Sequence, residues 1–171
     1  MSVDAELKKF GNYVVKQSKE NLIAEKKADT KGLYNSIKFE SKVSPNSFYL
    51  AFTMSDHGKF VDKGVKGFSS SAKAPKSPFK FGTGTGGEGG LTSGINGWVK
   101  RKRIQFKDRK TGRFLSYKST SSLIINSIWH KGIRTTNFFT KPFEDAFKAL
   151  PDDLIKAYGL EVDKLFKNTT Q

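Results

Sequence analysis

Residues 37–54 read IKFESKVSPNSFYLAFTM, and this stretch decides the fold that the sequence predicts. Apolar side chains recur on one face on both sides of a turn at residues 44–47; they are Ile37, Phe39, Val43, Phe48, Leu50, Phe52 and Met54. A period of two is typical of a strand with one buried face, and Ser, Pro and Asn are typical turn residues. We therefore expect an antiparallel β-hairpin with an apolar face that other elements cover.

An amphipathic helix is predicted before the hairpin. In residues 3–27 apolar side chains recur at close to 3.6 residues, and Lys and Glu fill the opposite face. Such a helix needs a partner surface to be stable, and the hairpin can supply it. We expect residues 29–32 to end the helix and residues 33–37 to lead into the first strand.

Further helices are predicted after the hairpin. A short turn or helix is expected around Phe60, and two others over residues 91–99 and 123–129, the second ended by Gly132. A last helix should open at Thr140, after an extended segment at Phe138 and Phe139, with Pro142 in its first turn, where a missing amide costs little. Residues 150–153, LPDD, should kink or restart it.

These elements predict one domain over residues 1–171, of the α+β class. A small, mostly antiparallel sheet would pack against the N- and C-terminal helices, with a long basic arm between strands. Residues 65–90 are rich in Gly, Ser, Lys and Pro, which predicts a flexible arm without regular structure.

The positive charge is concentrated in the middle of the chain. Residues 59–118 carry fifteen Lys or Arg and three acids, whereas the flanking parts are nearly balanced, within a total formal charge of +15. A basic segment of this kind attracts nucleic acid or an acidic protein surface. It is equally consistent with a solvated loop that charge keeps soluble.

Eight cations within residues 100–113 form the candidate contact patch: Lys100, Arg101, Lys102, Arg103, Lys107, Arg109, Lys110 and Arg113. Phe106 lies inside this segment and Phe114 follows it. Interleaved aromatics and cations serve single-strand binding, and Arg beside aromatics is typical of protein interfaces. We favour a protein partner, because the aromatic side chains beside these cations can anchor a protein contact.

The sequence offers no constellation for catalysis, so we expect no enzyme, no cofactor and no metal. There is no cysteine, and the two histidines, His57 and His130, lie far apart. Residues 82–87 match G-x-G-x-x-G, but a dinucleotide site needs a strand before the motif and an acid about 20 residues on, where Lys107 stands. No G-x-S-x-G elbow is present.

No membrane association is expected either. No run approaches the ~18 consecutive apolar residues of a membrane span, and the first residues, MSVDAE, are acidic where a signal peptide would be basic. The sequence therefore predicts a cytoplasmic protein, or a part of something that is assembled in a cytoplasm.

Three short motifs, in this order, resemble those of the tail-completion or head–tail joining (neck) proteins of tailed bacteriophages. Residues 29–37, DTKGLYNSI, resemble D-T-G-x-L-x-x-S-I; residues 57–64, HGKFVDKG, resemble Y-x-x-F-V-E-x-G; and residues 137–143, NFFTKPF, resemble x-x-F-F-x-x-P-F. The chain departs from the pattern at Lys31, which is inserted before the glycine, at Asp62, which replaces glutamate, and in its long basic insert.

The resemblance implies a non-enzymatic virion protein: a ring subunit at the head–tail junction, as a neck, tail-completion or tail-terminator protein. Its partners would be copies of itself, the neighbouring portal, neck or tail-tube proteins, and genomic DNA passing through the lumen. The ring would be six-fold on the tail side or twelve-fold near the portal. The alternative from the residues themselves is a non-specific nucleic-acid-binding protein that uses residues 59–118.

Overall fold

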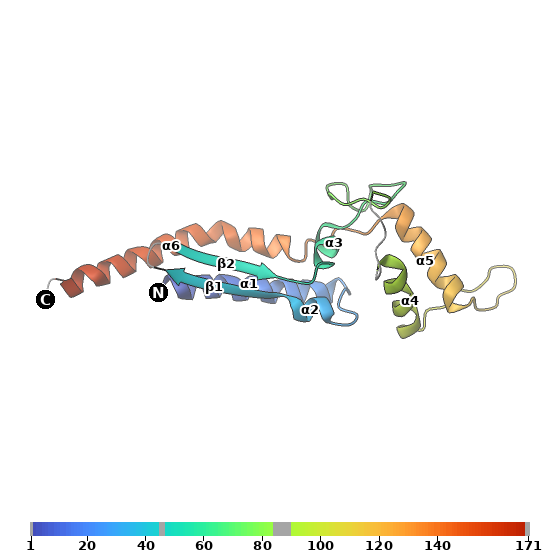
Figure 1. The fold of residues 1–171 in the computed structure, drawn as a ribbon, viewed down its shortest axis with the longest axis horizontal. Helices are drawn as coiled ribbons and strands as arrows, with labels where there is room; N and C mark the ends of the chain where they lie inside the picture. Colours follow the sequence, from blue (N-terminus) through green and yellow to red (C-terminus); the bar gives the residue numbers. More distant parts are fainter. Residues whose placement is uncertain (1, 45–46, 84–89, 170–171) are drawn as a thin grey trace. The chain divides into compact units, whose positions relative to one another are not determined.

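The computed structural model describes residues 2–44, 47–83 and 90–169, with side chains up to Ala157. This part of the chain contains six helices and one antiparallel pair of strands, which confirms the α+β class (Figure 1). The elements are α1 (Val3–Ala24), α2 (Gly32–Ser36), β1 (Lys38–Ser44), β2 (Ser47–Thr53), α3 (Gly58–Lys63), α4 (Leu91–Arg101), α5 (Tyr117–Lys131) and α6 (Thr140–Thr169).

The chain divides into two compact units. Met1–Gly58 and Asn137–Gln171 form the first, here called the terminal unit, and Lys59–Thr136 form the second, the inserted unit. The predicted arm belongs to the inserted unit. That both units fold as one domain stays a prediction, since compactness does not measure folding cooperativity.

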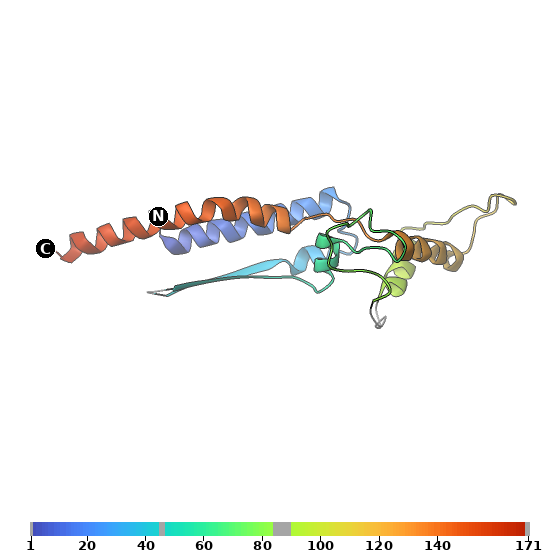
Figure 2. The same cartoon turned by 90° about the horizontal axis from the view of Figure 1, so that it is seen from above.

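The terminal unit consists of two layers. Helices α1 and α6 run side by side in opposite directions, and the hairpin lies along one side of the pair (Figures 1 and 2). Apolar side chains from both helices are buried between them, a helix-to-helix contact that the sequence analysis did not predict. These residues are Val3, Leu7, Phe10, Val14, Leu150, Leu154 and Ala157.

The antiparallel hairpin that the sequence predicted is present, and the structure gives its register. Phe39 on β1 pairs with Phe52 on β2, and Val43 pairs with Phe48. Phe39 and Phe52 are partly buried, whereas Val43 and Phe48, closer to the turn, are exposed. The end of the hairpin near Phe52 therefore provides the surface that packs against the helices.

Phe52 lies at the centre of an aromatic cluster that joins all three elements. Its ring centroid is 6.1 Å from that of Phe10 on α1, 5.4 Å from Phe139 and 5.8 Å from Phe143 on α6. All three pairs have the edge-to-face geometry that aromatic quadrupoles favour, each contributing about 0.5–1.5 kcal/mol beyond burial.

Helix α1 is shorter than expected, and a short helix that was not expected precedes β1. Helix α1 ends before residue 27, because Lys26 has φ +54° and the amide of Lys27 donates to the carbonyl of Leu22 (2.9 Å), a left-handed cap. The segment before β1 is also not directly extended, since α2 forms first. Its Leu33 is buried, and packing of this side chain favours the extra helical turn.

Three further expectations differ from the structure in whole or in part. Helix α6 continues through Pro151 without a restart, because Leu150 and Leu154 are both buried against α1 and offset a proline cost of about 3 kcal/mol; a kink at Pro151 stays a prediction. The predicted arm does not lie between strands, since β1 and β2 both precede it. Phe138 and Phe139 form a turn rather than an extended segment, and Phe138 is fully buried.

The described part of the predicted arm, residues 65–83, follows a defined path through hydrogen bonds. The Lys66 amide donates to the Phe79 carbonyl (2.8 Å), and the Phe81 amide donates to the Lys66 carbonyl (2.9 Å). The buried Ser77 hydroxyl donates to the Gly64 carbonyl (2.7 Å). Composition alone did not indicate these contacts, and residues 84–89 lie outside the described part.

The segment after α5 completes the inserted unit. Val65 and Ile133 exchange backbone hydrogen bonds of 2.9 and 2.8 Å, and the Phe68 amide donates to the Trp129 carbonyl (2.8 Å). The segments around Gly64 and Ile133 approach each other closely. Gly64 has φ +71°, and a Cβ on this residue would stand 2.6 Å from the Ile133 carbonyl oxygen. Only glycine fits this position.

A Gly64→Ala substitution should therefore destabilise the inserted unit by at least about 1–3 kcal/mol, the cost of a non-glycine residue held at a strained backbone conformation. The matched control is Gly94→Ala in α4, where a Cβ meets nothing within 4 Å and helix propensity should add up to about 1 kcal/mol. Both tryptophans lie in the inserted unit, so urea unfolding followed by tryptophan fluorescence measures it. Equal midpoints for the two variants would contradict this account.

Candidate interaction surface

Nearly all of the net charge belongs to the inserted unit. Lys59–Thr136 carry seventeen Lys or Arg and three acids, a formal charge of +14, whereas the terminal unit carries fourteen and thirteen. The boundary between compact units is therefore also a boundary in charge. Cations in this number attract an anionic partner over a Debye length, about 8 Å at physiological salt.

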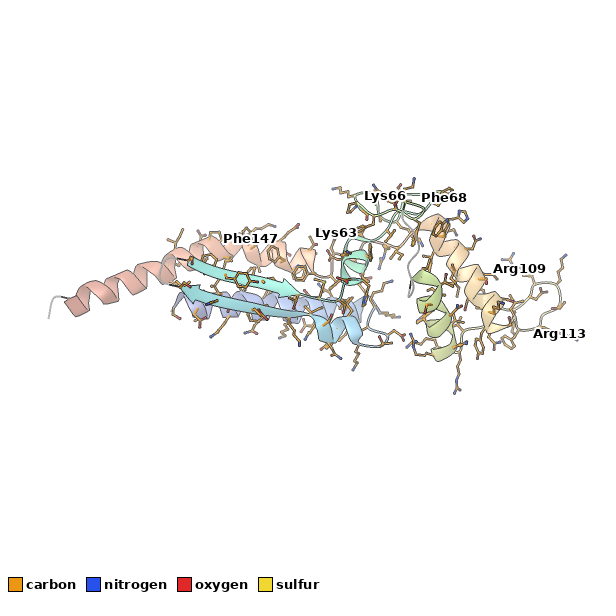
Figure 3. All side chains as sticks on the ribbon, viewed as in Figure 1. Lys63, Lys66, Phe68, Arg109, Arg113 and Phe147 are labelled. Atoms are coloured by element: carbon orange, nitrogen blue, oxygen red, sulfur yellow. The ribbon has the colours of Figure 1, made fainter. Side chains whose placement is uncertain are left out.

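All eight residues of the predicted patch are exposed. They form two groups within the inserted unit. The first group lies at and just after the C-terminal end of α4, where the helix dipole stabilises cations; it consists of Lys100, Arg101, Lys102 and Arg103. Lys107, Arg109, Lys110 and Arg113 lie on residues 106–115, here called the basic loop, which projects beyond the start of α5 (Figure 3).

The first group is shaped by the way α4 ends. Arg103 has φ +53°, its amide donates to the Lys100 carbonyl (3.2 Å), and the Ile104 amide donates to the Val99 carbonyl (3.0 Å). These two hydrogen bonds form a Schellman cap, in which Arg103 stands at the left-handed position that glycine usually occupies. Val99 is fully buried, so the cap fixes the turn that leads into the basic loop.

The basic loop is a short hairpin with a fixed base. The Leu115 amide donates to the Phe106 carbonyl (2.8 Å), and the Asp108 amide donates to the Arg113 carbonyl (2.8 Å). The Phe106 amide donates to the hydroxyl of Thr120, a fully buried residue of α5 (3.2 Å). These bonds attach the loop to the helix and limit its backbone freedom.

Asp108 organises the tip of this loop. Its Oδ1 accepts hydrogen bonds from the amides of Thr111 (2.7 Å) and Lys110 (2.8 Å) and from the Thr111 hydroxyl (3.1 Å). These bonds, the Thr111 amide first, lower the pKa of Asp108 from its ordinary value of 3.8. The one acid of the loop is thus occupied by the turn itself, and the four cations face outward.

Two aromatic side chains accompany these cations. Phe106 is 42% exposed and Phe114 is 64% exposed. The Lys107 Nζ lies 5.1 Å from the centroid of the Phe114 ring, within cation–π distance. The basic loop therefore combines positive charge with exposed apolar surface, as the sequence predicted.

The sequence did not predict a second aromatic group in the inserted unit. The Phe81 and Trp129 ring centroids are 5.4 Å apart, and Phe68 meets His130 edge-on at 6.2 Å. His130 Nδ1 is 3.0 Å from the hydroxyl of Ser69. The aromatic residues within the Gly- and Lys-rich segment could have indicated this packing, because disordered segments contain few aromatic residues.

Metal sites and membrane-spanning helices have no support within the described part of the chain. Among the described residues no group of three or more His, Asp or Glu side chains is placed to hold a metal ion. No helix in the same part of the chain is long and apolar enough to cross a bilayer. Most of the glycine tract at 82–87 lies outside the described residues.

Comparisons of the chain with family models, with curated proteins and with solved structures find no match. The resemblance to phage neck proteins therefore rests on the three ordered motifs alone. The structure places these motifs at α2, at α3 and at the start of α6. Three residues of these motifs are buried and contribute to the packing of the core: Leu33, Ile37 and Phe138.

The lowered pKa of Asp108 gives a pH prediction. The turn should be stable above the ordinary carboxyl pKa and should loosen as pH falls through the lowered one, since protonation weakens the three hydrogen bonds. An NMR titration should show the Asp108 carboxyl shifting with a midpoint below 3.8, together with the amides of Lys110 and Thr111. A Thr111→Val variant, which keeps both amide donors, should raise the midpoint only partly. A midpoint at or above 3.8 in the unsubstituted chain would contradict the assignment.

Proposed function

We propose that this protein is a structural virion protein: a ring subunit at the phage head–tail junction that acts by self-assembly and protein contacts. The ordered motifs suggest the class, and copies of the chain, portal, neck or tail-tube proteins and genomic DNA in the lumen are its partners. On this proposal its location is the virion, after assembly in the host cytoplasm.

The observation that carries the proposal is the division of charge between the two units. A ring requires a heterologous interface, in which one surface of each subunit meets a different surface of the next. The nearly neutral terminal unit and the +14 inserted unit offer two such different surfaces. Repulsion between two units of charge +14 disfavours pairing of one inserted unit with another.

The build of the basic loop supports a protein partner. Its base is tied to α5 and its tip to Asp108, so little backbone entropy is lost when it binds. Arginines beside exposed aromatics are enriched at the energetic centres of protein interfaces. Arg109 and Arg113 lie on the loop with Phe114, which provides this combination.

A second candidate is non-specific nucleic-acid binding through residues 59–118. The specific observation in its favour is the placement of the Lys107 ammonium near the exposed Phe114 ring. Single-strand binders combine a positive surface with aromatic rings on which bases stack. Phosphate contacts by the same cations would add affinity without sequence preference.

Replacing Arg101, Arg103, Arg109 and Arg113 with Ser should block assembly of the parent particle, because the contact patch loses half of its cations. The matched control replaces four exposed lysines of the terminal unit, Lys16, Lys38, Lys42 and Lys156. Both variants should keep the far-UV circular dichroism of the parent chain. Electron microscopy of particles should then show headless tails or tailless heads for the first variant alone. Normal particles from the first variant would contradict the proposal.

Binding of duplex and single-stranded DNA separates the two candidates. A ring subunit should bind both only in the non-specific range, about 10⁻⁴–10⁻⁶ M at physiological salt, with affinity falling steeply as salt rises. Fluorescence anisotropy across a salt series measures this. Nanomolar affinity at physiological salt would favour the nucleic-acid candidate instead.

A further inference from the structure

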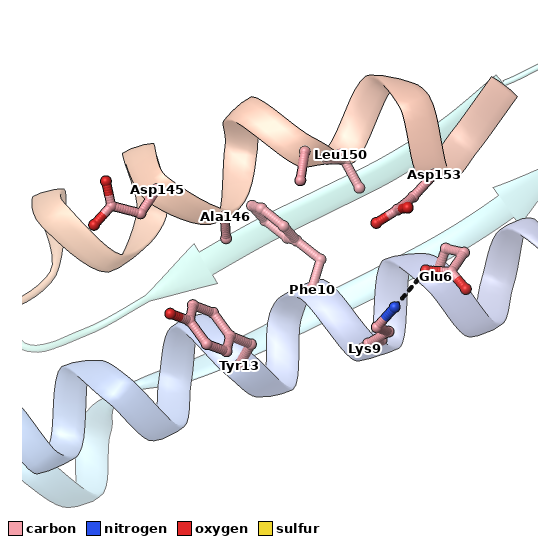
Figure 4. Close-up of a pocket in the computed structure, with 9 residues that line it drawn as sticks. Glu6, Lys9, Phe10, Tyr13, Asp145, Ala146, Leu150 and Asp153 are labelled. Carbon is pink, nitrogen blue, oxygen red and sulfur yellow. Dashed lines mark hydrogen bonds and ion pairs between the residues drawn. The ribbon is translucent and has the colours of Figure 1, made fainter. Parts of the chain in front are cut away.

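A groove runs along the terminal unit between α1 and α6, with a volume of about 250 Å³ (Figure 4). Its walls are mostly apolar and include Phe10, Ala146 and Leu150. Three carboxylates border it, from Glu6 on α1 and from Asp145 and Asp153 on α6. The groove thus combines an apolar floor with an acidic rim.

The acidic rim is incompletely neutralised within the chain. Glu6 is only 5% exposed, and its carboxylate meets Lys9 Nζ at 3.4 Å, longer than the ~2.7–2.9 Å of a strong charged hydrogen bond. Lys9 is the one cation among the lining residues, which leaves them a formal charge of −2. Lys148, outside the lining, meets Asp145 at 3.5 Å, and exposed pairs of this kind contribute little. A buried carboxylate with a weak partner is stabilised by a second, closer cation.

The size of the groove indicates what it can accept. Pockets for small molecules measure ~300–1,000 Å³, whereas this groove is smaller. It has room for one or two side chains of a partner. An aromatic ring would match the floor, and a guanidinium would match the rim, since Arg binds carboxylates in a bidentate manner.

We propose that this groove binds the basic loop of a second copy of the chain, an inference that rests on the self-assembly proposed above. The loop carries Lys107, Arg109, Lys110 and Arg113 against one acid, a formal charge of +3, which complements the −2 of the groove. The 64% exposed Phe114 supplies the aromatic ring, and Arg109 and Arg113 supply the guanidinium groups.

The contact is heterologous, because the loop belongs to the inserted unit and the groove to the terminal unit. Every copy offers one loop and one groove, so the stoichiometry is balanced without any other protein. Repetition of the same contact from copy to copy generates a ring when the rotation closes. A loop fixed by its own hydrogen bonds also presents the cations in one arrangement, which favours a specific register.

A disulfide trap tests the contact directly, because the chain has no cysteine of its own. Cysteines at Phe114 and at Ala149, an exposed residue that lines the groove, should link neighbouring copies into disulfide-bonded oligomers in particles and in concentrated protein. The control pairs Phe114→Cys with Lys16→Cys, at an exposed position of α1 outside the lining. Cross-linking no stronger than in this control would overturn the inference, as would a disulfide formed only within one chain.

Charge reversal gives an independent test. The loop variant carries Arg109→Glu and Arg113→Glu, and the groove variant carries Asp145→Lys and Asp153→Lys. Neither should oligomerise alone, measured by native mass spectrometry, whereas their mixture should form oligomers that contain the two variants in equal number. In these oligomers an intact loop meets an intact groove, and a reversed loop meets a reversed groove of opposite charge.

The outcomes separate this inference from the proposed function. If the unsubstituted chain forms closed rings and neither variant changes them, the loop–groove contact is wrong and the ring proposal stands. If the unsubstituted chain forms no oligomer in solution or in particles, both are wrong. If the groove variant loses only its binding to a peptide of another virion protein and oligomerises as the unsubstituted chain does, that protein occupies the groove instead, and the inference falls.

Discussion

The packing of Phe52 is the interaction on which the rest of the structure depends. This side chain comes from the hairpin, yet its ring meets Phe10 from the N-terminal helix, Phe139 from the turn before the C-terminal helix and Phe143 from that helix. The helices lie side by side because the hairpin gives both the same apolar surface. The groove between α1 and α6 exists only through this arrangement, and so does the return of the chain after the inserted unit.

Local periodicity predicted the elements that have one buried face. The alternation around Phe52 predicted the hairpin, and the 3.6-residue spacing predicted α1; the register of the hairpin came from the structure. Features set by distant contacts were not predictable in this way. Helix α6 passes Pro151 because of burial against α1, and the path of residues 65–83 depends on hydrogen bonds to residues after α5, such as that between Val65 and Ile133. A Gly- and Lys-rich composition does not show which distant segment of the chain will accept these hydrogen bonds.

The candidate site shows the same limit. Cation spacing placed all eight residues of the patch on exposed surface, but it did not show that Asp108 shapes the turn that presents them. The groove could not be read from sequence, since Glu6 and Asp153 belong to helices at opposite ends of the chain and meet only after folding. On the proposed contact the two units have different roles. The terminal unit would supply the acidic groove, and the inserted unit would supply the positively charged loop that binds it.

The central claim is that copies of this chain join head to tail through the basic loop and the α1–α6 groove. A cryo-EM reconstruction of the assembled oligomer, or of the neck of the particle that contains it, tests this most directly. The account predicts a closed ring in which density for Phe114 and Arg113 lies between Phe10 and Asp153 of the adjacent copy. A ring whose basic loops all point into a DNA-filled lumen, with the groove left open, would contradict it.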